Sequence, residues 1–213
     1  MLSKQFEDYG LGSRRLAMHP LLGEGIFSQD GPAWRRSREL IRQQFVRIHK
    51  ETPQSFVPHV DKLLASIAEA TSADGHIDLK PLMFEFTLNT TTALVFGESH
   101  GTMPKEQGES VWRYYDEAVF GCGIRVRLAD AAFLYNPAKF KKACQAVQNW
   151  ATFFASKAMR FKDEHGEEAA AEKYPFIIDL WKQLHDFDLV RDQLLHILVA
   201  GRDSTASLLC WTL

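Results

Sequence analysis

The stretch Val199-Ala200-Gly201-Arg202-Asp203-Ser204-Thr205-Ala206 lies inside the most apolar part of the chain, residues 194–213. A glycine within a helix costs roughly 1 kcal/mol relative to alanine, and the serine and threonine that follow can bond back to main-chain carbonyls and bend the helix. A small residue followed by glycine would let a flat ligand approach the backbone, while the acid and the hydroxyls could relay protons. An ordinary kink in a helical core is the alternative that so short a motif leaves open.

The charges of this stretch decide what kind of helix it belongs to. Arg202 and Asp203 interrupt residues 194–213 near their middle and would be costly in lipid. The stretch therefore predicts a buried core helix rather than a membrane span. If such a helix were left uncovered on one side, each exposed Leu-sized side chain would lose roughly 1.5–3 kcal/mol, and we expect the isolated chain to be loosely packed or aggregated.

A second motif, Trp34-Arg35-Arg36-Ser37-Arg38, lies in a segment with helical spacing. Residues i and i+4 share a helix face, so the Trp34 indole N–H and the Arg38 guanidinium can form a fork for a carboxylate or propionate. A surface cation–π pair on a basic helix is the alternative reading.

The remaining patterns predict a mainly α chain with few strand signals. We expect helices over residues 33–47, 60–70, 81–97, 110–121, 137–162, 174–184 and 188–213. Residues 1–32 are rich in Gly and Pro and predict a loop-like opening. Residues 76–79 predict a short strand, and residues 163–173 predict a solvated connector that could be helical at its edges.

Composition narrows the function without defining it. The chain has 25 basic and 27 acidic residues in 213, a net charge of −2, so no global field would attract nucleic acid. Its cysteines are odd in number and widely spaced, which favours a reducing compartment over a disulfide framework. The first residues contain no apolar segment typical of a secretory signal.

Taken together, in this order and at this separation, the two motifs resemble the cytochrome P-450 family of haem-thiolate monooxygenases. Trp34-x-x-x-Arg38 looks like the family's C-helix signature, and Ala200 to Thr205 looks like its oxygen-activating I-helix motif. Residues 21–31, 86–92, 95–99 and 191–203 are similar in running sequence to the fungal alkane and fatty-acid hydroxylase branch.

The resemblance implies a partial cytochrome P-450 domain over residues 1–213, from the B–C loop to the I-helix, without the haem-ligand loop and most of the β-sheet region. It implies hydroxylation of a long-chain alkane or fatty acid with O2, haem b, and electrons from NADPH through cytochrome P-450 reductase. It also implies an endoplasmic reticulum membrane location, although we expect no anchor in these residues. The implied site residues are Asp203, Ser204 and Thr205 for proton delivery, Trp34, Arg38, Ala200 and Gly201 for haem contact, and Phe27 and Phe120 for substrate.

Several arginines have a possible role by the same resemblance. Arg125 and Arg127 could meet a fatty-acid carboxylate, although a solvated surface position is favoured. Arg35, Arg36 and Arg42 could face an acidic reductase, and a merely solvated basic face is an equal alternative.

The chain departs from the family pattern in two ways. Ser204 replaces the usual threonine, which keeps the hydroxyl but loses the methyl that stiffens the rotamer. None of Cys122, Cys144 and Cys210 lies in the Phe-x-x-Gly-x-Arg-x-Cys-x-Gly loop that supplies the iron ligand, so we assign no metal ligand in this chain. We therefore expect a truncated, inactive fragment; a helical protein with only an interaction role is the alternative function.

Overall fold

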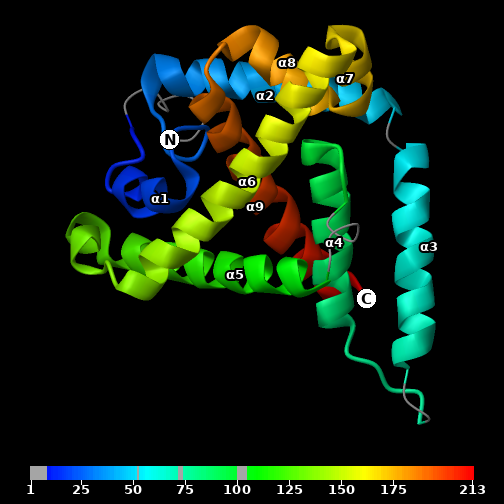
Figure 1. Cartoon of the computed structure of the whole chain (residues 1–213). Helices are drawn as coiled ribbons and strands as arrows, with labels where there is room; N and C mark the ends of the chain where they lie inside the picture. Colours follow the sequence, from blue (N-terminus) through cyan, green and yellow to red (C-terminus); the bar gives the residue numbers. More distant parts are fainter. Residues whose placement is uncertain (1–8, 52, 72–73, 100–104) are drawn as a thin grey trace.

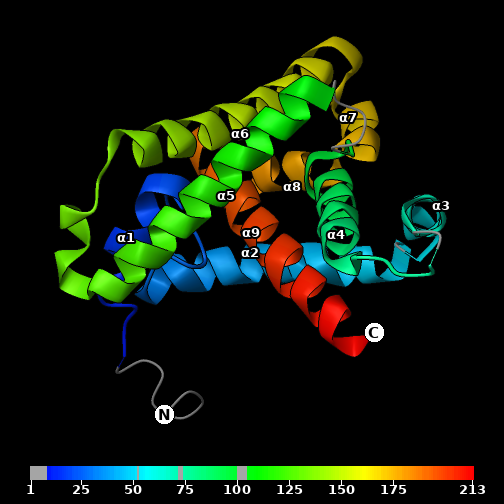
Figure 2. The same cartoon turned by 90° about the horizontal axis from the view of Figure 1, so that it is seen from below.

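The computed structural model describes residues 9–51, 53–71, 74–99 and 105–213, and these are organised as helices with no strand among them (Figures 1 and 2). The mainly α class predicted from the sequence is thereby confirmed. In chain order the elements are α1 (Arg14–Leu22), α2 (Gly31–Glu51), α3 (Pro53–Ala70), α4 (Leu79–Phe96), α5 (Lys105–Leu128), the 3-10 helix η3 (Ala129–Leu134), α6 (Ala138–His165), α7 (Glu167–Lys173), α8 (Pro175–Leu184) and α9 (Phe187–Thr212).

Helix α9 is the element around which the others pack. Helices α1, α4, α6 and α8 all contact it, whereas α3 lies at one edge of the molecule against α4 (Figure 1). The side chains of Leu194, Leu195 and Leu198 are buried, each contributing roughly 1.5–3 kcal/mol. Within the described residues, no helix is both long and apolar enough to span a bilayer.

Aromatic side chains join α4, α5 and α6. The ring centroids of Phe96 and Trp150 are 4.6 Å apart, and those of Trp112 and Trp150 are 5.3 Å apart, both in edge-on geometry. Such pairs add about 0.5–1.5 kcal/mol to the burial of their area. The cluster therefore fixes the position of α4, which in turn packs along α9 (Figure 2).

The prediction of a loop over the whole of residues 1–32 is wrong for residues 14–22, which form α1. Its apolar residues Leu21 and Leu22 are buried, and Gly23, with a φ of 64°, ends it by donating its N–H to the carbonyl of His19. Proline and glycine near a short helix hid it, because Pro20 lies inside the helix rather than beyond it.

Arg125 explains how α1 is held. This arginine is buried, and its guanidinium donates to the carbonyls of Leu16 (2.8 Å), Ala17 (3.2 Å) and Tyr135 (2.8 Å). Both sequence readings of Arg125, a ligand for a fatty-acid carboxylate and a solvated surface residue, are therefore wrong. Arg125 is buried by these tertiary contacts, which its local sequence pattern does not predict.

Other element boundaries differ from prediction for local reasons. The strand expected at 76–79 is absent, since Asp78 accepts a hydrogen bond from the N–H of Lys80 (3.0 Å) and caps α4. Pro58, expected to precede a helix, lies inside α3. Helix α9 begins before the predicted residue 188, because the Asp186 carboxylate accepts from the N–H of Leu189 (3.1 Å) and caps the helix.

The segment expected at 163–173 to be a solvated connector is helical except at Gly166. Gly166 ends α6 with a φ of 88°, and α7 then forms over Glu167–Lys173. The two acidic residues at the start of α7 favour the helix through their interaction with its dipole.

The close approach of α4 to α9 depends on Gly201. A β-carbon built there would lie 2.7 Å from Thr91 Oγ1 and 2.9 Å from Thr91 Cγ2. In an open helix, replacing glycine by alanine would stabilise the protein by about 1 kcal/mol. Here the added methyl would instead push two buried helices apart.

We expect Gly201→Ala to lower the free energy of unfolding by about 1–3 kcal/mol, as overpacking does in other cores. Urea denaturation checks this, and Gly123→Ala is the matched control, because a β-carbon at Gly123 meets nothing within 4 Å. Adding Thr91→Ala to Gly201→Ala should recover part of the loss. If the two substitutions were simply additive, the contact would not limit the approach of α4.

Candidate functional site

Helix α9 changes character along its length. From Asp192 to Leu198 every residue is buried, whereas Ala200, Ser204 and Leu208 are exposed, as is Trp211 beyond them. The exposed fractions reach 66% for Leu208 and 89% for Trp211. Spacings of four, four and three residues place these side chains on one side of the helix, and we refer to Ala200, Ser204, Leu208 and Trp211 as the open stripe.

Ser204 lies on the open stripe with its hydroxyl turned back to the helix. Its Oγ donates to the carbonyl oxygen of Ala200 at 2.8 Å. This back-bond is the one that the sequence predicts for a serine in this position, and α9 continues through it to Thr212. The hydroxyl proton is thus held locally, while the lone pairs of the oxygen remain available as acceptors. Thr205, the next residue, is also exposed.

Asp203 lies at the flank of the stripe and is paired with a buried arginine. Nη1 of Arg202, a residue that is 8% exposed, donates to Asp203 Oδ1 at 3.0 Å and to Asp116 Oδ1 of α5 at 2.8 Å. Burial raises the pKa of Asp203 above its ordinary value, and Arg202 partly offsets this rise. The site therefore contains a half-buried acid that is joined to α5 through one guanidinium.

Aromatic rings complete the surroundings of Arg202. Its guanidinium carbon lies 4.7 Å from the Tyr115 ring centroid and 5.3 Å from that of Phe84. Sequence reasoning missed Arg202, Tyr115 and Asp116. A charged residue within a core helix was the available signal, because such a charge requires partners from other elements.

Gly201 lies between the open stripe and α4. It precedes Ser204 by three residues and Leu208 by seven, so it borders the stripe, and a β-carbon built on it would meet the Thr91 side chain of α4. In this structure its missing side chain therefore serves the packing of α4 on α9. Ala200, which precedes it, is exposed and presents a short side chain on the stripe.

The structure brings Trp34 and Arg38 together on α2. The Arg38 guanidinium carbon lies 5.6 Å from the centroid of the half-buried Trp34 ring, and Arg38 itself is exposed. Between them, Ser37 accepts a hydrogen bond from Gln193 Nε2 of α9 at 2.6 Å, and Arg36 donates to the carbonyl of Gln183 of α8 at 3.1 Å. These contacts fix the turn of α2 that presents the pair.

The two aromatic residues predicted for substrate contact lie in different settings. Phe27 is half-buried, in the loop before α2, and its ring centroid is 5.5 Å from that of His196 on α9. Phe120, on α5, is 61% exposed. Phe27 therefore lies close to α9, whereas Phe120 belongs to the surface of α5.

None of the cysteines is placed as a thiolate on the open stripe. Cys122 and Cys144 are buried, and burial raises the pKa of each thiol to about 12. Both are therefore neutral at physiological pH. Cys210 follows Asp203 by seven residues and so lies on the flank of α9 rather than on the stripe.

The pairing of Arg202 with Asp203 predicts a measurable change in acidity. Arg202→Met should raise the pKa of Asp203 further, because the guanidinium lowers it through charge and a hydrogen bond. A raised carboxyl pKa means that the folded chain binds more protons than the unfolded chain, so stability falls as pH rises through that range. NMR titration of the Asp203 carboxyl checks this, with Arg36→Met as the control. An unchanged pKa would contradict the assigned pairing.

The family model described as Cytochrome P450 matches residues 4–213. Cytochrome P450 52A12 of Debaryomyces hansenii is 34% identical over 227 residues, which cover 100% of this chain and 43% of that protein. Cytochrome P450 52A6 of Candida tropicalis is 34% identical, and Cytochrome P450 52-E3 of Starmerella bombicola is 35% identical, each over 100% of this chain and 42% of the relative. The chain thus spans less than half the length of these relatives, and because the family model covers nearly all of it, the chain belongs to the cytochrome P450 family.

Proposed function

We propose that this chain forms part of a haem-dependent monooxygenase that hydroxylates long-chain alkanes or fatty acids, using O2 and electrons that a reductase delivers from NADPH. The observation that supports this most directly is the open stripe of α9, with Ser204 on it and Asp203 at its flank, in a chain of the cytochrome P450 family. The choice of alkanes or fatty acids rests on the similarity of residues 21–31, 86–92, 95–99 and 191–203 to that branch.

The residues present fit a haem. The short side chain of Ala200 and the back-bonded Ser204 keep one side of α9 low enough for a flat macrocycle to approach. The exposed guanidinium of Arg38, next to the Trp34 indole, has the charge and the donors that a propionate accepts. When bound, the haem would supply the binding and activation of O2.

The chain's own residues would deliver protons to the reacting group. Asp203, with its raised pKa, is a better proton donor near neutral pH than an ordinary carboxyl. Ser204 Oγ can accept a proton from that side and release the one that it shares with the carbonyl of Ala200. Thr205 offers a second hydroxyl on the other flank of the stripe.

Substrate and partners follow from the same proposal. Phe27 beside α9 and Phe120 on α5 would provide apolar contacts for a long alkyl chain. The exposed Arg35 and Arg42 of α2 favour an acidic surface on the reductase. The location proposed for the protein is the endoplasmic reticulum membrane.

We expect the haem that the chain binds to have no thiolate bond to its iron, because Cys122 and Cys144 are buried neutral thiols and Cys210 lies off the open stripe. Haem titration of the purified chain, followed by reduction and addition of carbon monoxide, checks the absorption spectrum. The matched control replaces Cys122, Cys144 and Cys210 by serine. A thiolate spectrum that this control abolishes would contradict the prediction.

Replacing Ser204 should uncouple NADPH consumption from product formation. In a full-length P450 carrying this segment, Ser204→Ala should lower the hydroxylation rate about a hundredfold, the lower end of the range for losing a positioned proton donor. The peroxide released per NADPH consumed should rise, because proton delivery would no longer keep pace with electron delivery. Product and peroxide are measured together with a long-chain fatty acid and an alkane as substrates.

Ser204→Thr is the matched control, since it keeps the hydroxyl and adds only a methyl group. Unchanged coupling in Ser204→Ala would remove Ser204 from proton delivery. A full-length protein that binds haem but oxidises neither substrate class would refute the substrate assignment, and one that fails to bind haem would favour a helical protein with only an interaction role.

A further inference from the structure

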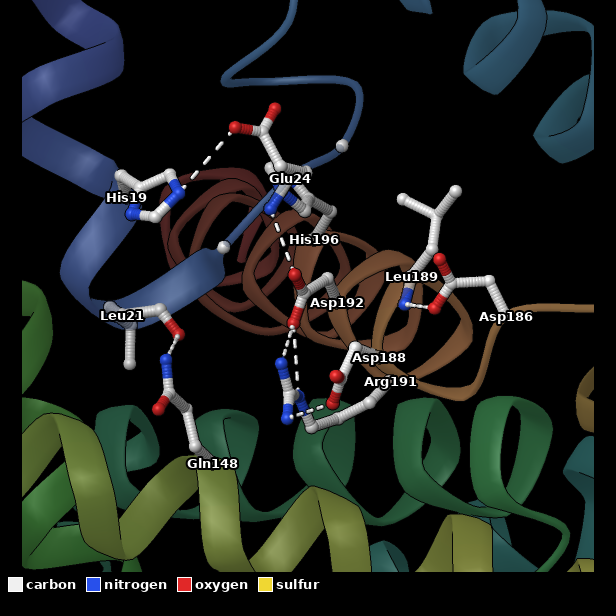
Figure 3. Close-up of polar contacts among 12 residues, drawn as sticks. His19, Leu21, Glu24, Gln148, Asp186, Asp188, Leu189, Arg191, Asp192 and His196 are labelled. Carbon is white, nitrogen blue, oxygen red and sulfur yellow. Dashed lines mark hydrogen bonds and ion pairs between the residues drawn. The ribbon is translucent and has the colours of Figure 1, made fainter. Parts of the chain in front are cut away.

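The loop between α1 and α2 lies along α9 and is held there through its backbone (Figure 3). The N–H of Glu24 donates to Asp192 Oδ2 at 2.9 Å, and the N–H of Phe27 donates to His196 Nδ1 at 3.2 Å. Asp192 and His196 are four residues apart and so share one face of α9. Two consecutive turns of the helix thus grip one loop, residues 23–28.

Glycine permits this close approach. A β-carbon at Gly23 would collide with the Asp192 carboxylate, and one at Gly25 would collide with the His196 ring. Ser28 braces the loop from within, because its Oγ donates to the Gly23 carbonyl at 2.7 Å and accepts from the N–H of Gly25 at 2.9 Å. The loop and the two α9 side chains therefore fit each other only when both glycines are present.

The contact with Phe27 requires neutral His196. A ring nitrogen that accepts a hydrogen bond carries no proton, so Nδ1 is unprotonated and Nε2, 3.5 Å from Ser28 Oγ, carries the hydrogen. The side chain is fully buried, and desolvation lowers its pKa to about 4. The charge that acts on His196 is that of Glu24 in the loop, which raises the pKa of His196 and is itself contacted by Arg15 and His19 of α1. On α9, Asp192 one turn away is paired with Arg191, which also contacts Asp188.

We infer that His196 is a positioning residue which, together with Asp192, holds Phe27 beside the start of the open stripe. Ala200 follows His196 by four residues, about 6 Å or one turn along the same face of α9. A backbone bond to His196 therefore fixes how far Phe27 lies from the surface on which the substrate would react. This inference rests on the proposed function for what Phe27 faces, whereas the grip on the loop can be tested without it.

The contacts by which Asp192 and His196 hold loop residues 23–28 should weaken as pH falls. When the loop opens, His196 becomes exposed and regains a pKa near its ordinary value of 6.5, against about 4 when the loop is closed. Between these two values the open state binds more protons, so its population rises about tenfold per pH unit on acidification. Above this range the grip is complete. Burial raises the pKa of Asp192 above its ordinary value of 3.8 when the loop is closed. At pH values from 3.8 upward the closed state therefore binds more protons at Asp192 than the open state does, and the effect of Asp192 on the loop is opposite to that of His196.

Amide hydrogen exchange of the whole chain tests the inference. After correction for intrinsic exchange, the protection of the Phe27 amide in the unaltered chain should fall as the pH is lowered from about 6.5 to 4, with a slope that approaches tenfold per pH unit where Asp192 does not titrate and is smaller toward the acid end, where Asp192 opposes it. His196→Gln, whose side-chain oxygen can accept the same bond without titrating, should keep the protection near neutral pH and remove this slope. His196→Leu should lose the protection at neutral pH, while amides of α6 stay protected.

The outcomes separate the inference from the proposed function. An identical slope in the unaltered chain and His196→Gln, or unchanged Phe27 protection in His196→Leu, would overturn the role of His196. If His196→Leu does not fold, the comparison with His196→Gln still decides. Asp192→Ala should expose the Glu24 amide, whereas Asp192→Asn, which keeps the acceptor, should not. None of these measurements needs haem, so a failure to hydroxylate would leave them valid.

Discussion

Complete burial of residues 192–198 of α9 is the constraint on which the rest of the structure depends. Between Asp192 and Leu198 no face of the helix reaches solvent, so any polar side chain there must find its partner in another segment. Three such residues occur, and each joins α9 to the N-terminal part of the chain. Asp192 and His196 hold the loop before α2, and Gln193 donates to Ser37 of α2.

These polar contacts specify position where apolar packing alone would be tolerant. Leu and Ile side chains fill space in several registers, whereas a buried hydrogen bond has one geometry and a large penalty when it is broken. Arg202 extends the same principle toward the site, because it joins α9 to Asp116 of α5 while lying over the Tyr115 ring. Polar residues of α9 itself thus place the loop before α2, α2 and α5.

The sequence allowed the helical class and the main motifs to be predicted, because periodicity and the Trp34-x-x-x-Arg38 and 199–206 patterns are local properties of the chain. It did not reveal α1, whose helix tolerates Pro20, or the burial of Arg125, which depends on carbonyls more than a hundred residues away in sequence. The partners of His196 and Arg202 were hidden for the same reason. The sequence interpretation of Gly201 was that it lets a flat ligand approach the backbone. It did not include the packing of α4, because nothing in the local pattern shows that Thr91 lies beside Gly201.

The order Arg202-Asp203-Ser204-Thr205 has a geometric meaning on a helix. Each residue points about 100° from the one before it, so consecutive side chains do not face one another. Arg202 points into the core, Ser204 outward, and Asp203 and Thr205 to opposite flanks, as their burial indicates. A proton passing from Asp203 to Ser204 therefore needs a bridging water between flank and stripe. In the proposed function, the acid would exchange protons with solvent on its flank while Ser204 would face the substrate, and the two positions lie less than one turn apart on the helix.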